Sequence, residues 1–281
     1  MKDSLKICGW QINHQEKLIY QANKGNPFIS LKFFNYPNYR QNVLINRFPA
    51  QCRIKSKGCN SFFLFNHKVR TKGVIPLERT ITVIPKTSFI NPEDDWGKIS
   101  DFPLFLPEKY QQNLEYWSIK SELINDISNQ QWFKYNELSK WVQSVSHFIK
   151  NIIKHREKQE KRLGAHQAIY MGIGDCDEFT DLLITISRIR GIPCRRLTGY
   201  FKSNKESTGE AHAWGEIFSP KKGWIPIDIA LNNIGYHTIN YIILKIEEFN
   251  SSLSDYQIQV KHTSTVHYKW EIPNPIFSPI Y

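Results

Sequence analysis

The sequence lacks the features that mark membrane-spanning, secreted and disulfide-rich proteins. It contains no apolar run of about 18 residues, the length that a helix needs to cross a bilayer. The N-terminus has no basic segment followed by an apolar stretch and a small-residue cleavage site, so no secretory signal is readable. The cysteines are odd in number and widely spaced, which disfavours a disulfide framework: Cys8, Cys52, Cys59, Cys176 and Cys194. We therefore expect a soluble, cytoplasmic protein.

Signals for a metal, a cofactor or a nucleic acid are also missing. No Cys-x-x-Cys pair occurs, so we expect no metal site, and no cofactor is indicated. Cys52 and Cys59 remain open as a pair or as metal ligands, although two idle thiols are favoured. The 37 basic and 26 acidic residues leave a net charge of +11, which permits an anionic partner. The basic residues are scattered, however, and the densest stretch, 150–162, also contains Glu157 and Glu160, as a solvated helix face does. Nucleic acid is therefore disfavoured as a partner, and no membrane partner is expected.

The sequence does contain enough apolar residues for a packed core. Hydrophobic residues make up 41% and aromatic residues 14% of the 281 residues. Short strand-like runs bounded by Gly, Pro and Asn occur at 29–33, 62–65 and 80–84. Turn residues then dominate 86–109. We predict a β-rich N-terminal domain with its linker over 1–108, and a separate catalytic core over 109–281.

The periodicity of apolar residues changes within this second part. Helical spacing predicts helices over 118–130, 136–156 and 176–190. Strand-like runs follow at 194–201, 212–218, 223–228 and 238–245, with weaker ones up to 270. The sequence therefore predicts an α+β fold in which helices pack on an antiparallel sheet, preceded by the β-rich N-terminal domain.

The start of the third predicted helix contains the most informative residue, Cys176. Asp175 and Glu178 have the spacing of a capping box, which places Asp175 at the N-cap and Cys176 at the first helical position. Gly174 loosens the backbone just before the helix. The N-terminal amides of a helix favour a thiolate and can donate to an oxyanion. The carboxylates of Asp175, Asp177 and Glu178 oppose a thiolate, so a cationic partner is required. The alternative is that Cys176 is a small apolar residue that closes the helix start.

Two of the predicted strands supply such a partner and a residue to orient it. On strand 212–218, His212 and Trp214 share one face, and the small residues of the other face would let a helix approach closely. Strand 223–228 ends in Asp228. A lone strand histidine is more often a half-buried polar group, and an Asp after an apolar run more often caps a turn. Together, however, a Cys at a helix start followed by a His and an Asp on successive strands supply the thiolate, the base and the orienting group that cysteine acyl transfer requires.

These residues resemble the transglutaminase-like superfamily, in particular its microbial members. The resemblance covers residues 163–229 and is looser over 115–162. It rests on three blocks: Gly174-Asp175-Cys176-Asp177-Glu178-Phe179 with Arg190-Gly191-Ile192-Pro193-Cys194-Arg195-Arg196, then His212-Ala213-Trp214-Gly215-Glu216, and Gly223-Trp224-Ile225-Pro226-Ile227-Asp228. The resemblance implies a papain-like α+β core and a thioester intermediate on Cys176, with His212 and Asp228 completing a Cys-His-Asp triad.

The residues and the resemblance together predict a thiol enzyme that acts on amide bonds of protein or peptide substrates. Water or an amine would resolve the thioester, and we favour hydrolysis, as in a cysteine peptidase or deamidase, slightly over amine transfer, as in crosslinking. Trp214, Asp177 and Gly174 are assigned to the substrate pocket or to oxyanion support. The alternative is a non-catalytic protein-binding module that retains the triad. An anion-binding protein that uses the net charge ranks third, and the oligomeric state is left open.

Overall fold

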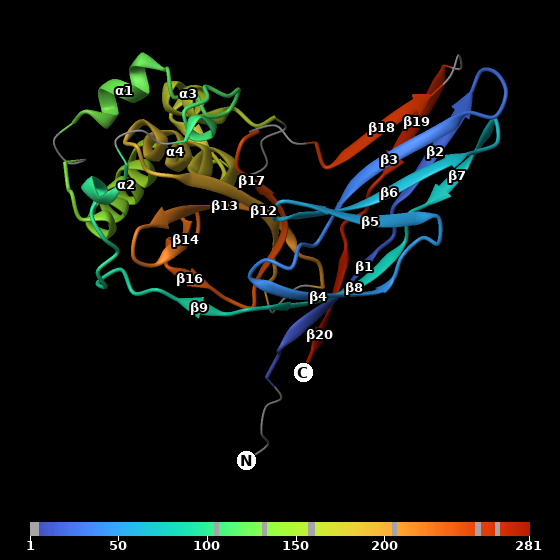
Figure 1. Cartoon of the computed structure of the whole chain (residues 1–281), viewed down its shortest axis with the longest axis horizontal. Helices are drawn as coiled ribbons and strands as arrows, with labels where there is room; N and C mark the ends of the chain where they lie inside the picture. The colour runs from blue at the N-terminus through green and yellow to red at the C-terminus, as the bar shows by residue number, and fades with distance from the viewer. Residues whose placement is uncertain are drawn as a thin grey trace.

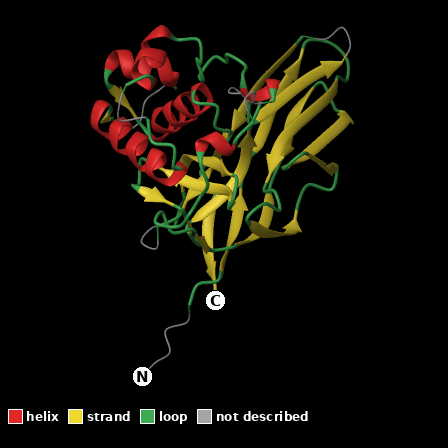
Figure 2. Ribbon diagram, turned by 60° about the vertical axis from the view of Figure 1, so that its left-hand side comes forward, coloured by secondary structure: helices red, strands yellow, loops and turns green. Residues whose placement is uncertain are grey.

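The chain forms two bodies that lie side by side (Figure 1). The computed structural model describes residues 6–103, 107–130, 134–156, 161–203, 207–250, 254–261 and 265–281. One body contains the helices and a sheet, and the other consists of strands; Figure 2 shows the helices gathered on one side of the molecule. This arrangement confirms the predicted α+β class with a β-rich N-terminal region. Among the described helices, none has the length and apolar character needed to cross a membrane.

The helical part of the first body consists of α1 (Glu122–Ser128), α2 (Leu138–Ile152), α3 (Gly164–Met171) and α4 (Cys176–Ile189), with 3-10 turns at Ile99–Asp101 and Glu108–Tyr110. Three of these helices lie within the predicted ranges. α2 ends before residue 156, so the stretch 150–162 is not one helix face, and its residues 157–160 lie outside the described residues. α3 was not predicted because its eight residues are too few to show a clear period. It ends at Met171, and the next residue, Gly172, has a φ of 65°, the left-handed conformation of a C-cap glycine.

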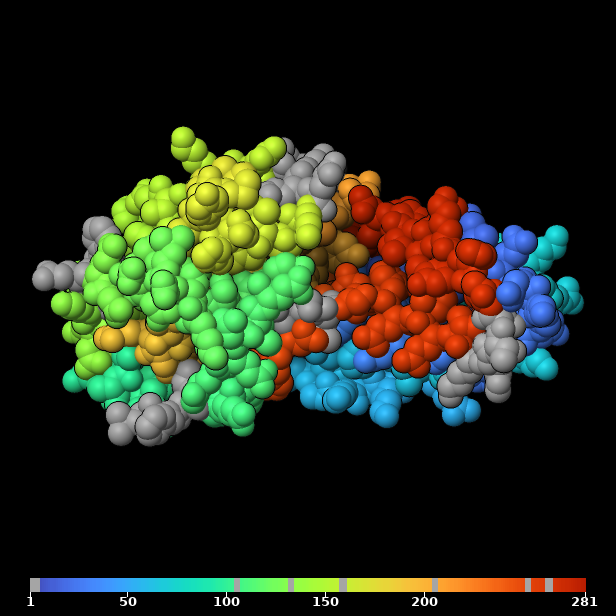
Figure 3. Space-filling model, turned by 90° about the horizontal axis from the view of Figure 1, so that it is seen from above, coloured from blue at the N-terminus to red at the C-terminus, as the bar shows by residue number. Residues whose placement is uncertain are grey.

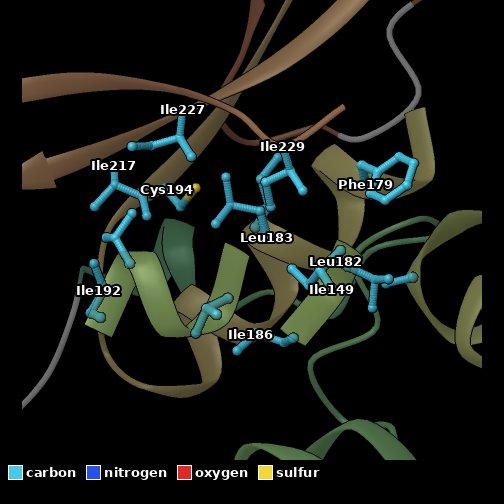
Figure 4. Close-up of a cluster of buried hydrophobic side chains, with 14 of the residues drawn as sticks. Ile149, Phe179, Leu182, Leu183, Ile186, Ile192, Cys194, Ile217, Ile227 and Ile229 are labelled. Carbon is cyan, nitrogen blue, oxygen red and sulfur yellow. The ribbon is translucent and has the colours of Figure 1, made fainter. Parts of the chain in front are cut away.

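A five-stranded antiparallel sheet lies against these helices, in the order β15-β14-β13-β12-β17. Its strands are β12 (Cys194–Phe201), β13 (Glu210–Ser219), β14 (Gly223–Asp228), β15 (Asn233–Ile234) and β17 (Tyr241–Glu247). A side chain at Gly215 would lie 2.7 Å from Cδ2 of Leu183, so α4 approaches β13 as closely as the predicted small residues allow. Figure 4 shows Leu183 beside Ile217 and Ile227 in the buried cluster that joins α4 to the sheet.

The second body contains three antiparallel sheets, in the orders β20-β1-β8-β4, β18-β3-β6-β5 and β19-β2-β7. Their strands are β1 (Gly9–His14), β2 (Lys17–Ala22), β3 (Phe28–Asn35), β4 (Gln41–Arg47), β5 (Cys52–Lys57), β6 (Asn60–Lys68), β7 (Lys72–Pro76), β8 (Arg79–Pro85), β18 (Tyr256–Lys261), β19 (Val266–Glu271) and β20 (Ile276–Ile280). A separate hydrophobic core fills this body and includes Phe33, Phe63 and Ile81. Two short pairs, β9 (Ser88–Phe89) with β16 (Tyr236–His237) and β10 (Lys154–His155) with β11 (Ile173–Gly174), complete the described strands.

The β-rich body takes strands from both ends of the chain. β18, β19 and β20 pair antiparallel with β3, β2 and β1. Figure 3 shows the C-terminal segment, in red, spread over this body beside the helical one. The prediction of a core over 109–281 does not anticipate this pairing, because the partners lie far upstream and no local pattern marks them. The domain division itself stays a prediction.

Two side-chain amides from the β-rich body bind the edge of the five-stranded sheet at β17. Gln41 donates from Nε2 to the carbonyl oxygen of Ile243 at 2.7 Å and accepts from the Ile243 N–H at 3.0 Å. Asn60 makes the same pair of bonds with Ile246, at 2.7 and 2.8 Å. These hydrogen bonds satisfy backbone groups of β17 that a neighbouring strand would otherwise bind.

Candidate active site

Cys176 is the first residue of α4, as the capping-box spacing predicts. The side chain of Asp175 accepts from the Asp177 N–H at 2.9 Å, and Oε2 of Glu178 accepts from the Asp175 N–H at 3.0 Å. The first N–H groups of a helix have no acceptor within the helix, and their partial positive charge favours an anion. The half-buried thiol therefore lies where a thiolate gains stability from the backbone.

The ring of His212 lies between the side chains of Cys176 and Asp228. Its Nε2 is 2.7 Å from Oδ2 of Asp228, and the ring also hydrogen-bonds with the Cys176 side chain. Burial works against a charged ring, but the hydrogen bonds to Asp228 and Cys176 outweigh it and raise the pKa of His212 to about 10. These contacts favour the imidazolium form of the ring. Because Nε2 faces Asp228, Nδ1 is the nitrogen left for the thiol.

The carboxylate of Asp228 is held by further donors. The hydroxyl of Tyr241 donates to Oδ2 at 2.8 Å, and the Leu231 N–H donates to Oδ1 at 3.1 Å. Asn233 in turn donates from Nδ2 to the Tyr241 oxygen at 2.9 Å. The sequence analysis did not find Tyr241, since β14 and β17 are not neighbours in the sheet and no spacing in the chain relates them.

Trp214 supports the ring of His212 from within the protein. The two rings stack with their centroids 6.0 Å apart and an interplanar angle of 19°. Tyr241 meets Trp214 edge-on at 5.1 Å, and Phe201 meets His212 edge-on at 5.9 Å. Trp214 is only 1% exposed and is not among the cavity-lining residues, so its position suits a support for the imidazole. Its assignment to a pocket wall stays a prediction.

A cavity of about 440 Å³ opens beside Cys176 and His212. Its walls come from the start of α4, from β12, β13 and β17, and from the residue before β18. Many of its lining residues are charged: Arg162, Arg196, Lys245, Asp175, Asp177, Glu247 and Asp255. Gly199, which pairs with His212 across the sheet, also lines it, and a side chain there would lie 1.9 Å from the carbonyl oxygen of Ile242. The cavity therefore has many charged side chains in its walls, and its shape depends on a backbone contact that only glycine permits.

Asp177 and Gly174, the other two predicted support residues, lie in different surroundings. Asp177 lines the cavity, but its Oδ1 is 2.5 Å from Nη2 of Arg196. Burial would raise the pKa of Asp177, but Arg196 outweighs burial and lowers it. Gly174 is buried behind the helix start, where a side chain would lie 2.5 Å from Cβ of Glu178. Gly174 thus makes room for the capping Glu178, and the assignment of both residues to the pocket or the oxyanion stays a prediction.

One group of potential metal ligands stands out in the described part of the chain: Asp175, Cys176 and Asp177, whose ligand atoms lie within 4.8 Å of one another. Asp175 already caps the helix, and Asp177 is paired with Arg196. Since these groups already have partners in the protein, we assign no metal to them.

Comparisons with known sequences find similarity within the helical body. Residues 122–229 match the family model of the Transglutaminase-like superfamily. The match begins at α1, upstream of the resemblance over 163–229. A curated relative described as "Uncharacterized protein YebA", from Bacillus subtilis (strain 168), is 28% identical over 68 residues. That alignment covers 20% of this chain and only 9% of the relative's length.

Similarity to solved structures extends over both bodies. A structure from Cytophaga hutchinsonii, described as a "putative cysteine protease", aligns with a TM-score of 0.59 and 17% identity over 97% of this chain and 94% of that chain. The periplasmic domain of TgpA from Pseudomonas aeruginosa, bound to ethylmercury, gives a TM-score of 0.35 and 11% identity over 82% of this chain and 91% of that chain. The first likeness shows a shared fold, and the second is too low to add to it.

Proposed function

Since residues 122–229 match the family model of the Transglutaminase-like superfamily, we propose that this chain is a thiol enzyme acting on amide bonds through a thioester on Cys176. The observation that supports this most directly is the 2.7 Å contact of His212 with Asp228, with Cys176 and His212 lining the same cavity. The class of substrate that suits it is a protein or a peptide. Cys176 is the nucleophile, His212 the general base and acid, and Asp228 the residue that orients His212.

Acylation begins with the proton on His212 and the negative charge on the Cys176 sulfur. The sulfur attacks the carbonyl carbon of the amide, and the N–H groups at the start of α4 stabilise the oxyanion that forms. When this intermediate collapses, the C–N bond breaks and His212 gives its proton to the leaving nitrogen. An amine or ammonia departs, and the acyl group remains on Cys176 as a thioester.

Deacylation uses His212 in its neutral form. His212 takes a proton from water while the water oxygen attacks the thioester carbonyl, and the C–S bond then breaks to return the Cys176 thiolate. A primary amine in place of water would give a new amide. Charged side chains line the cavity and would hold water near the thioester, which favours hydrolysis over amine transfer.

Asp228, Tyr241 and Trp214 act through His212 in this mechanism. Asp228 stabilises the imidazolium and fixes the orientation of the ring. Tyr241 holds the carboxylate, and Trp214 packs against the flat face of the imidazole. None of the three has to contact the substrate.

The test is the pH profile of iodoacetamide alkylation, read at Cys176 by peptide mass spectrometry because Cys8 and Cys59 are also exposed. We expect Cys176 to react at a pH well below the usual thiol pKa of about 8.5. His212→Ala should return the midpoint of the profile to that of a free thiol while the circular dichroism spectrum is retained. An ordinary thiol midpoint in the unaltered protein would refute the ion pair.

Hydrolysis and amine transfer are separated by the products of a glutamine-containing peptide, incubated with and without a primary amine. Hydrolysis gives peptide cleavage or a glutamate product in both conditions, with a mass that does not depend on the amine. Transfer gives an amine adduct. A protein-binding module that retains the triad would give neither product and no acyl adduct on Cys176 in the intact-mass spectrum.

A further inference from the structure

Arg196 on β12 lies buried beneath the start of α4 and meets acidic groups from two elements. Its Nη2 is 2.5 Å from Oδ1 of Asp177, and its Nη1 is 3.5 Å from Oδ1 of Asp181. Its Nε is 3.0 Å from Oε2 of Glu247 on β17, an ion pair rather than an aligned hydrogen bond. The side chain is only 5% exposed, and it lines the cavity that contains Cys176.

The contact with Asp177 matters because Asp177 directly follows the nucleophile. The potential ligand atoms of Asp175, Cys176 and Asp177 lie within 4.8 Å of one another, so a carboxylate charge lies close to the sulfur. A like charge at this distance disfavours a thiolate. The helix start and His212 would have to overcome this repulsion if Asp177 had no cationic partner.

Asp175, Asp181 and Glu178, the other acidic groups near the start of α4, have different partners. Asp175 accepts from the Asp177 N–H at 2.9 Å. Asp181 accepts from Nε of Arg162 at 2.7 Å and from the indole N–H of Trp117 at 2.9 Å. Glu178 accepts from two backbone N–H groups, and burial raises its pKa to about 7, so its charge is partly lost near neutral pH. Among the cations that lower the pKa of Asp177 against burial, Arg196 contributes most, and Arg162 and Lys245 contribute less.

We propose that Arg196 is a positioning residue for the nucleophile: it cancels the charge of Asp177 at the sulfur, so that the helix start and His212 stabilise the Cys176 thiolate. This inference rests on the proposed thiol chemistry. Arg196 does not touch the reacting atoms and acts through Asp177. The competing role is purely structural, a buried ion-pair centre that joins α4 to β12 and β17.

The experiment compares the alkylation midpoint of Cys176 in three proteins: the unaltered chain, Asp177→Asn, and the double variant Asp177→Asn/Arg196→Gln. Asp177→Asn leaves Arg196 in place with Asp181 and Glu247 as partners, and should lower the midpoint by about one pH unit. The double variant exchanges an ion pair for a neutral pair and should restore the midpoint of the unaltered protein. Neither variant leaves Asp177 charged without its arginine.

The outcomes separate this inference from the proposed function. If the double variant keeps the lowered midpoint of Asp177→Asn, Arg196 does not act on the sulfur and its role is structural. If the midpoint of the unaltered protein is that of a free thiol and His212→Ala does not move it, the proposed chemistry itself fails. A single Arg196→Met variant, where it folds, should raise the midpoint, and thermal unfolding followed by circular dichroism verifies that the folded state is being compared.

Discussion

Replacing Asp228 by Asn should raise the pH at which Cys176 becomes reactive. The imidazolium of His212 faces Asp228 through a hydrogen bond of 2.7 Å. A neutral amide in its place can hold the ring but does not stabilise its positive charge. In the proposed ion pair the His212 cation in turn stabilises the Cys176 thiolate. Destabilising the cation therefore destabilises the thiolate as well.

The structure gives the size of this effect. The pKa of His212 rises from 6.5 to about 10 against the opposing effect of burial. This difference of about 3.5 pH units corresponds to about 5 kcal/mol. The hydrogen bond to Asp228 is the largest of the effects that raise the pKa of His212, ahead of those of Cys176. We therefore expect the alkylation midpoint of Cys176 to rise by about 1 to 2 pH units in Asp228→Asn.

The assay must follow the midpoint rather than the rate at a single pH. A thiolate of low pKa is also a weaker nucleophile, so a larger thiolate fraction is partly offset by slower attack. The matched control is Asp94→Asn, which makes the same chemical change at an exposed residue paired with Lys222 and should leave the midpoint unchanged. A midpoint in Asp228→Asn that stays within about 0.3 pH units of the unaltered protein, with both variants folded, would refute the reasoning.

Three further changes test the neighbourhood of the site. Tyr241→Phe removes one donor to Asp228 and should raise the same midpoint by less than about 1 pH unit. Gly199→Ala should lower the free energy of unfolding by at least about 2 kcal/mol, measured in urea, since its Cβ would lie 1.9 Å from the Ile242 oxygen. Glu216→Gln removes a fully buried carboxylate that pairs with two arginines. We expect the free energy of unfolding to fall by about 3 to 5 kcal/mol in the same urea measurement.

Local signals allowed the sequence to place Cys176 at the first position of α4. The capping box joins Asp175 and Glu178 across three residues, so its spacing is readable and the structure shows both of its hydrogen bonds. The contact between His212 and Asp228 has no such local signal. It depends on the register of β13 against β14, in which Gly215 lies opposite Ile227, and a one-residue slip would turn one side chain to the other face. The order of the residues in the chain indicated the triad, but only the fold supplies the distance.

The residues that sequence analysis missed are those whose partners are remote and unpatterned. Tyr241 reaches Asp228 across the sheet, and Arg196 reaches Glu247 on a strand that follows much later in the chain. The burial of Trp214 likewise follows from packing against Leu197 on β12 and Tyr241 on β17 rather than from its alternation with His212. The strands near the C-terminus pair with the first strands of the chain, which no window of sequence can show.

Side chains of the β-rich body contact the five-stranded sheet of the helical body. Its amides of Gln41 and Asn60 bind the outer edge of β17, which would otherwise expose unpaired backbone groups. Arg40 of the same body lies with its Nε 2.5 Å from the carboxylate of Glu216. Glu216 follows His212 by four residues in β13, so the two side chains share one face of the strand. Without this body, β17 would have an open edge and the buried carboxylate would lose one of its two arginines. The β-rich body therefore completes the sheet that holds His212, and the core is not expected to keep its geometry alone.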